Sequence, residues 1–237
     1  MAGLFLLFLR RSVHALRRCF LSIFKAVDAF KSIHGFFLVK FYGSFVMNII
    51  LIGYRGSGKS AVGKILAEEL GLKLVDTDRV LEEKIACTID RYVAENGWDA
   101  FRMVEKMVVR SVSGQDNRVI ATGGGVVLDR ENVHHLKASG WVVWLQAGVS
   151  TLHERMARDE QSGLLRPGLT GESPLGEIEE ILSQRTPLYA KACDHVVNTD
   201  QKSIRAVSRE IMKAMPKASA LLAVRDQLRE SYFVLNP

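Results

Sequence analysis

The chain has 237 residues, enough for one domain with appendages, and its 48% apolar and 24% charged residues are ordinary for a globular protein. Its three cysteines (Cys19, Cys87 and Cys193) lie far apart, which predicts neither a disulfide framework nor a zinc site and favours a reducing compartment. The net charge of +6 comes entirely from residues 1–46, which contain seven basic residues and one acidic residue. The rest of the chain is neutral, so its charge does not indicate a nucleic-acid-binding domain.

Residues 1–46 form a basic extension that holds nine of the eleven phenylalanines. Phe and Leu mix with Arg and Lys at roughly helical spacing, which is typical of a segment that lies on a membrane or serves as a targeting peptide. The run GLFLLFL is too short to span a bilayer before Arg10 and Arg11. A third interpretation is a mis-assigned start, because Met47 directly precedes the first predicted strand. Membrane contact is expected only through this extension, if at all.

From Met47 onward, short apolar runs alternate with segments of helical period. Continuous apolar runs suit strands buried on both faces, which predicts strands at 48–53, 73–76, 118–123, 141–146 and 195–199. Helices are predicted at 59–70, 78–112 with breaks near Thr88 and Gly97, 129–139, 150–159, 176–186 and 203–214. This alternation predicts an α/β fold of three layers, with a five-stranded parallel sheet covered by helices on both faces.

Two later segments depart from the alternating pattern. Residues 160–175 are rich in Gly, Ser and Pro and show no period, which predicts a mobile lid. The tail at 216–237 predicts one more amphipathic helix, to which the sequence assigns no role.

The stretch GYRGSGKS, from Gly53 to Ser60, matches the pattern G-x-x-x-x-G-K-S and is called the P-loop below. Glycines let backbone N–H groups approach phosphate oxygens, and the following helix presents its positive N-terminal end. The pattern predicts that Lys59 reaches the β- and γ-phosphates of ATP and that Ser60 binds Mg²⁺. The nucleotide-binding residues predicted are Gly56, Ser57, Gly58, Lys59, Ser60 and Ala61.

Two carboxylates, Asp76 and Asp78, stand at the carboxyl end of the second predicted strand, where α/β sheets bind their ligands. If the backbone stays extended there, both side chains point to the same side. One carboxylate would then hold Mg²⁺ through water, and the other would take a proton from an acceptor hydroxyl. The alternative is a structural role, with Thr77 or Asp78 capping the next helix.

Two absences bear on what receives the phosphate. The chain has no Asn-Lys-x-Asp pattern of the kind that reads a guanine base, and the fourth predicted strand ends in VVWLQ without an acid. Both absences disfavour a GTPase switch or a motor ATPase. They favour a kinase that acts on a small molecule.

The motifs together resemble the shikimate kinase family. GYRGSGKS, DTD, FRMVE (101–105), GGG (123–125), LRP (165–167) and RTPLY (185–189) occur in the order and spacing of that family, over about residues 48–214. The resemblance implies a P-loop fold like that of nucleoside monophosphate kinases, with the kinase domain at 47–215. It further implies Mg²⁺-dependent phosphorylation of shikimate by ATP to shikimate 3-phosphate, a step towards chorismate and the aromatic amino acids.

The resemblance also implies how the acceptor is held. Arg102 and Arg185 would bind the shikimate carboxylate, and Glu105, three residues after Arg102 on one helix face, would hold that guanidinium in place. Gly123, Gly124 and Gly125 would lie beside the substrate ring. Asp76 would hold Mg²⁺ with Ser60, and Asp78 would be the catalytic carboxylate.

Two arginines are implied on the nucleotide side or in the lid. Arg166 would act as a catalytic residue over the transferring phosphate when the lid closes, although Gly168 should loosen that lid. Arg155 resembles the family arginine that packs on adenine, with Arg158 as the alternative. Lys59 completes the predicted catalytic set.

Two other functions remain open from the sequence. One is a related kinase with another small acceptor, such as gluconate, and the other is an inactive relative that serves as a binding protein. The expected partners are ATP and shikimate, without nucleic acid, and the expected state is a monomer. The expected location is the cytoplasm, or a plastid if residues 1–46 are a transit peptide.

Overall fold

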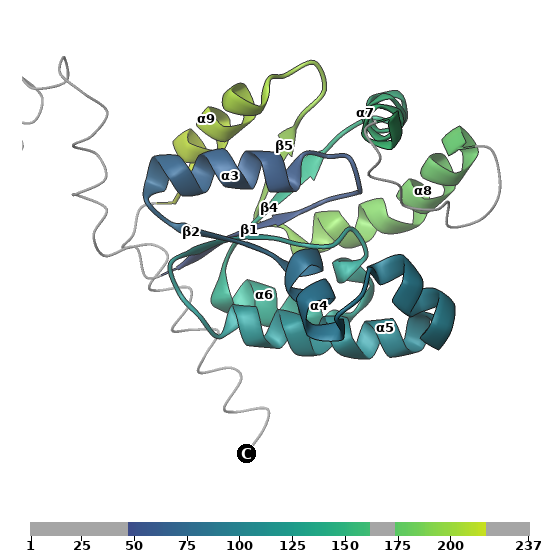
Figure 1. Ribbon diagram of the computed structural model, residues 1–237. Coiled ribbons are helices and arrows are strands. Elements are labelled where there is room, and N and C mark those ends of the chain that lie inside the picture. The colour runs from purple at the N-terminus through teal and green to yellow at the C-terminus, as the bar shows by residue number, and fades with distance from the viewer. Residues whose placement is uncertain (1–46, 162–173, 217–237) are drawn as a thin grey trace, which may run out of the picture. The chain divides into compact units, whose positions relative to one another are not determined.

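The computed structural model describes residues 47–161 and 174–216 (Figure 1). The predictions made for residues 1–46, for Arg166 and Gly168 in the predicted lid, and for the tail beyond residue 216 lie outside the described residues.

The centre of the fold is a parallel sheet of five strands in the order β2-β3-β1-β4-β5. The strands are β1 (Asn48–Ile52), β2 (Lys73–Asp76), β3 (Arg118–Ala121), β4 (Gly140–Gln146) and β5 (His195–Asn198). Each lies within one or two residues of its predicted range. The predicted fold class, an α/β protein with a five-stranded parallel sheet and helices on both faces, is therefore confirmed.

Seven α-helices and one short 3-10 helix accompany the sheet within the described part of the chain. They are α3 (Lys59–Leu70), α4 (Thr77–Ile85), α5 (Ile89–Ser113), η1 (Val126–Leu128), α6 (Arg130–Ser139), α7 (Val149–Gln161), α8 (Pro174–Ala192) and α9 (Ile204–Ala214). Helices α3 and α9 cover one face of the sheet, and α5, α6 and α8 lie on the other (Figure 1). Among the described helices, none combines the length and the apolarity that crossing a membrane requires.

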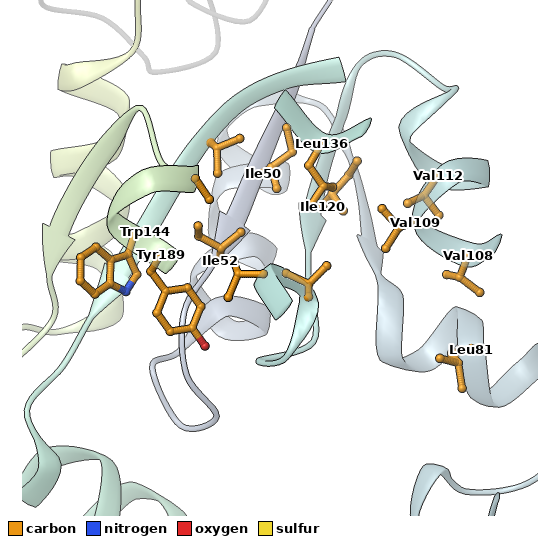
Figure 2. Close-up of a cluster of buried hydrophobic side chains, with 14 of the residues drawn as sticks. Ile50, Ile52, Leu81, Val108, Val109, Val112, Ile120, Leu136, Trp144 and Tyr189 are labelled. Carbon is orange, nitrogen blue, oxygen red and sulfur yellow. The ribbon is translucent and has the colours of Figure 1, made fainter. Parts of the chain in front are cut away.

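The central strand β1 shows why the sheet is covered on both faces. Its side chains alternate, so Ile50 and Ile52 pack with α5, α6 and α8, whereas Ile49 and Leu51 pack with α3 and α9. All four are fully buried, which explains the continuous apolar run in the sequence. Figure 2 shows the first of these two clusters, in which Ile50 and Ile52 lie among residues of the other strands and helices.

The predicted helix ends differ most at α8. The sequence predicted an end at residue 186, but α8 continues through Pro187 to Ala192, so that prediction was wrong. A proline inside a helix removes one backbone hydrogen bond. Packing beyond it offsets that cost, because Tyr189 is fully buried and stacks on Trp144 with ring centroids 5.6 Å apart (Figure 2).

The predicted breaks after residue 78 are both present. Thr88 caps α5, since its side chain accepts a hydrogen bond from the Arg91 backbone N–H. Gly97 has φ 80° and ψ 169°, which interrupts the helical backbone inside α5. The residues from Ile89 to Asn96 therefore form a helical segment of their own, and a second helical segment begins at Trp98.

Candidate active site

The P-loop connects the carboxyl end of β1 to α3. Its glycines Gly53, Gly56 and Gly58 all have positive φ, and Gly58 is the N-cap residue of α3. The buried Lys59 donates from Nζ to the backbone carbonyls of Gly53 and Tyr54, at 2.8 Å each. The loop is thus wrapped around its own lysine, with the helix N-terminus behind it. This geometry suits the binding of a polyphosphate.

Ser60 and Asp76 come together although they are far apart in the sequence. Ser60 Oγ donates to Asp76 Oδ2 at 2.6 Å. The other carboxylate oxygen of Asp76 accepts from the backbone N–H groups of Asp78 and Arg79 and caps α4. The hydroxyl and carboxylate are hard oxygen donors of the kind that Mg²⁺ binds beside nucleotide phosphates, so the residues present fit this ion.

The structure corrects two details of the aspartate pair. The residue that caps α4 is Asp76, not Thr77 or Asp78 as the structural alternative proposed. The backbone also does not stay extended up to Asp78, because α4 already begins at Thr77. The helix takes over directly after the strand, since the Asp76 carboxylate satisfies its first free N–H groups.

A pocket of about 500 Å³ lies beside the P-loop and is called the site pocket below. It is lined from the P-loop, from α4 and α5, from α8, and from the three-glycine loop, residues 123–125. Asp78, Arg102 and Arg185 all contribute to its walls, so the structure brings together three of the predicted site residues. They come from three different helices, α4, α5 and α8.

Arg102 is held in a defined position. Its Nη1 donates to Glu105 Oε2 at 2.7 Å, and its guanidinium carbon lies 5.0 Å from the Phe101 ring centroid and 5.5 Å from that of Trp98. Burial raises the pKa of Glu105 above its ordinary value, and the neighbouring Arg102 charge opposes this without cancelling it. The predicted pair of Arg102 and Glu105 is therefore present, with the carboxylate buried beneath the guanidinium.

The three-glycine loop leaves room for the charged side chains of the site itself. A Cβ atom added to Gly123 would lie 2.6 Å from Asp78 Oδ1, and one added to Gly125 would lie 2.6 Å from Arg102 Nη2. The prediction placed these glycines beside a substrate ring. In the structure, Gly123 and Gly125 lie against the side chains of Asp78 and Arg102, which line the pocket, so an added Cβ atom would collide with them.

The carbonyl of Gly124 anchors α8 to this loop. It accepts hydrogen bonds from Arg185 Nη1 at 3.2 Å and from the hydroxyl of Tyr189. Burial raises the pKa of Tyr189 to about 12, so this hydroxyl stays protonated and donates throughout the neutral range. The two contacts fix where Arg185 enters the site pocket.

On the opposite side of the P-loop, Arg155 of α7 lies against the loop backbone. It donates from Nη1 to the carbonyl of Gly56 at 3.3 Å and to Thr199 Oγ1 at 3.0 Å. Arg158, the alternative from the sequence, is exposed and forms an ion pair with Glu154. Of the two, Arg155 is the one hydrogen-bonded to the P-loop backbone.

Several residues of the site pocket were not singled out from the sequence. They are Tyr54, Arg55, Asp90, Trp98 and, next to the pocket, Tyr189. Arg55 and Tyr189 lie inside motifs that were quoted, so their proximity could have been inferred. Asp90 and Trp98 lie in no quoted motif. They reach the pocket because of the cap at Thr88 and the backbone break at Gly97.

A phosphate-binding loop beside a pocket whose walls carry the guanidiniums of Arg55, Arg102 and Arg185 and the carboxylate of Asp78 defines a P-loop kinase of small molecules. A family model described as shikimate kinase matches residues 55–216. "Shikimate kinase" of Symbiobacterium thermophilum is 45% identical over 170 residues, covering 71% of this chain and 96% of that protein. That of Nitratidesulfovibrio vulgaris is 43% identical over 158 residues, covering 67% and 90%. The chain belongs to the shikimate kinase family.

A solved structure gives the same result for the fold. "Shikimate kinase from Acinetobacter baumannii in complex with shikimate" superposes with a TM-score of 0.68 at 32% identity. The match covers 74% of this chain and 95% of that protein. The family model, over residues 55–216, covers most of the described residues.

Proposed function

We propose that the site pocket binds shikimate and that the enzyme transfers the γ-phosphoryl group of ATP to it, giving shikimate 3-phosphate and ADP. The observation that carries this proposal is the convergence of Asp78, Arg102 and Arg185 on one pocket beside the P-loop. Shikimate has one carboxylate and several ring hydroxyls. The two guanidiniums suit its carboxylate, and the Asp78 carboxylate suits a hydroxyl.

On the nucleotide side, the backbone of Gly56 to Ala61 would surround the phosphates at the start of α3. Lys59 would exchange its contacts with the loop carbonyls for the β- and γ-phosphate oxygens. Arg155, already fixed against Gly56 and Thr199, would pack on the adenine ring. Arg166 would add positive charge over the transferring group.

Ser60 and Asp76 would hold Mg²⁺, Ser60 directly and Asp76 through water. The ion supplies charge neutralisation at the phosphates. The contact of 2.6 Å between Ser60 Oγ and Asp76 Oδ2 supports this assignment, because it places both donors at the edge of the phosphate cradle.

In the site pocket, Arg102 and Arg185 would bind the carboxylate and thereby orient the ring. Asp78 would accept a hydrogen bond from the hydroxyl that reacts and take up its proton as the new P–O bond forms. Gly123 lets Asp78 lie against the three-glycine loop, which limits where that carboxylate can point. We propose that the enzyme acts as a monomer in the cytoplasm.

A coupled assay of ADP release tests the function. Purified protein with ATP and Mg²⁺ should release ADP rapidly when shikimate is added, and at background rates with gluconate or without an acceptor. If gluconate instead gives the rapid ADP release and shikimate gives none, the protein is a related kinase with another acceptor. Absence of nucleotide binding in a calorimetric titration would establish the inactive alternative, which the charged residues of the site disfavour.

A further inference from the structure

Arg55 is a cation of the site that neither the motif nor the family likeness assigned. It occupies a variable position of the P-loop pattern, two residues after Gly53, and it lines the site pocket. Its backbone nitrogen lies against the three-glycine loop, 3.2 Å from where a Cβ atom of Gly124 would stand. The residue therefore belongs to the phosphate cradle and to the pocket wall at the same time.

The Arg55 side chain also reaches the nucleotide side. Its Nε donates to Met156 Sδ on α7 at 3.0 Å. Met156 directly follows Arg155, which is bonded to the P-loop carbonyl of Gly56. The contact with Met156 thus holds the Arg55 guanidinium at the boundary between the predicted nucleotide site and the site pocket, where the phosphoryl group must cross.

The other two guanidiniums of the pocket have different fixed contacts. Arg102 is paired with Glu105 on α5, and Arg185 is bonded to the Gly124 carbonyl from α8. These two suffice for a single carboxylate, which two forked donors saturate. A third guanidinium on the P-loop itself matches a second anion, and the phosphoryl group in transfer carries negative charge on three equatorial oxygens.

We propose that Arg55 binds the phosphoryl group during its transfer and the phosphate of the product afterwards. The bond between phosphorus and the bridging oxygen of ADP breaks, and a bond from phosphorus to the acceptor oxygen forms. The acceptor proton passes to Asp78, and Arg55 takes no part in the proton transfer. Its contribution is charge stabilisation that grows towards the transition state. This inference rests on the proposed function of the site pocket.

The test compares Arg55→Met with Arg91→Met, a control that removes the same charge from an exposed arginine paired with Glu95 on α5. For Arg55→Met we expect kcat to fall by about 100-fold or more, in the range seen when one preorganised donor is lost. The KM for shikimate should stay within about threefold, and the Kd for shikimate 3-phosphate, measured by calorimetry, should rise about tenfold or more. The control should leave all three values unchanged.

Two results would overturn the inference. One is a kcat within threefold of wild type, and the other is an increase in the KM for shikimate as large as that in the Kd for shikimate 3-phosphate, which would make Arg55 a carboxylate ligand. If Arg55→Met does not fold, Arg55→Gln decides by the same measurements, because glutamine also removes the charge but keeps a polar side chain of similar length. Wild-type protein without shikimate-dependent ADP release would refute the proposed function instead, which separates the two failures.

Discussion

Gly125→Ala should damage the site while leaving the fold in place. Gly125 has φ −95° and ψ 0°, which alanine can adopt, so the backbone itself does not exclude a side chain. The added Cβ atom would lie 2.6 Å from Nη2, 2.7 Å from Nη1 and 3.0 Å from Cζ of Arg102. These are the far atoms of a long side chain that is 26% exposed, so the guanidinium can yield by moving away.

Moving the guanidinium away would weaken the contacts that Arg102 makes. Its hydrogen bond of 2.7 Å to Glu105 is charge-assisted, and such bonds contribute about 1.5–3 kcal/mol. If the same guanidinium binds the substrate carboxylate, a loss of this size lowers kcat/KM for shikimate by a factor of about 10 to 150. The P-loop is not displaced, so the KM for ATP should change by less than about threefold.

Steady-state kinetics with shikimate and ATP varied separately would measure both effects, and thermal unfolding would report the fold. Gly114→Ala is the matched control. Gly114 caps the end of α5 at φ −74°, and the nearest atom to an added Cβ atom is 3.6 Å away. A KM for shikimate in Gly125→Ala that equals that of Gly114→Ala would show that Arg102 does not depend on the missing Cβ atom.

Three further predictions concern single side chains. Arg102→Ala should lower kcat/KM for shikimate by about 100-fold or more with the KM for ATP nearly intact, and unchanged kinetics would show that the carboxylate site lies elsewhere. Asp76→Asn keeps the oxygen that caps α4 but removes the charge. The Mg²⁺ concentration for half-maximal rate should therefore rise about tenfold or more at an unchanged Tm, and an unaltered Mg²⁺ dependence would contradict the metal assignment. Because the pKa of Tyr189 is about 12 in the fold against 10.0 unfolded, the unfolded state ionises first as the pH rises. Wild type should then lose roughly 1–1.5 kcal/mol of stability between pH 9 and 11 that Tyr189→Phe does not lose, and parallel urea-unfolding curves would refute this.

The sheet and the P-loop could be predicted because each depends on local chemistry. Five apolar runs give five strands, and the glycines of GYRGSGKS stand where positive φ is needed. Predictions failed where a distant contact overrides the local rule. Pro187 argues for a helix end, yet the packing of Tyr189 on Trp144 carries α8 past it. The sequence contains both residues but not their proximity.

The walls of the site pocket were harder to predict for a similar reason. The sequence around Asp90 and Trp98 is typical of an ordinary amphipathic helix, and it is the cap at Thr88 and the backbone break at Gly97 that set where these residues lie. Arg55 stands where the P-loop pattern accepts any residue, so the motif gives no information about its side chain. Tyr189 donates to a backbone carbonyl 65 positions away in the sequence. Because every residue has a backbone carbonyl, the residue types do not reveal this contact.

The three-glycine loop explains how side chains from separate helices reach one pocket. Gly123 accommodates the Asp78 carboxylate, and its N–H donates to the hydroxyl of Thr77 at 3.0 Å, which ties the loop to α4. The carbonyl of Gly124 anchors α8, and Gly125 leaves space for Arg102 of α5. Arg185 is held by the Gly124 carbonyl and Arg102 by the Glu105 carboxylate, so both guanidiniums are positioned without help from a ligand. A site assembled in this way spends little free energy on reorganisation when charge develops in the reaction. The glycines therefore contribute to catalysis chiefly by allowing the walls of the pocket to assemble. A side chain at Gly123 or Gly125 would displace Asp78 or Arg102 and so impair activity more than stability.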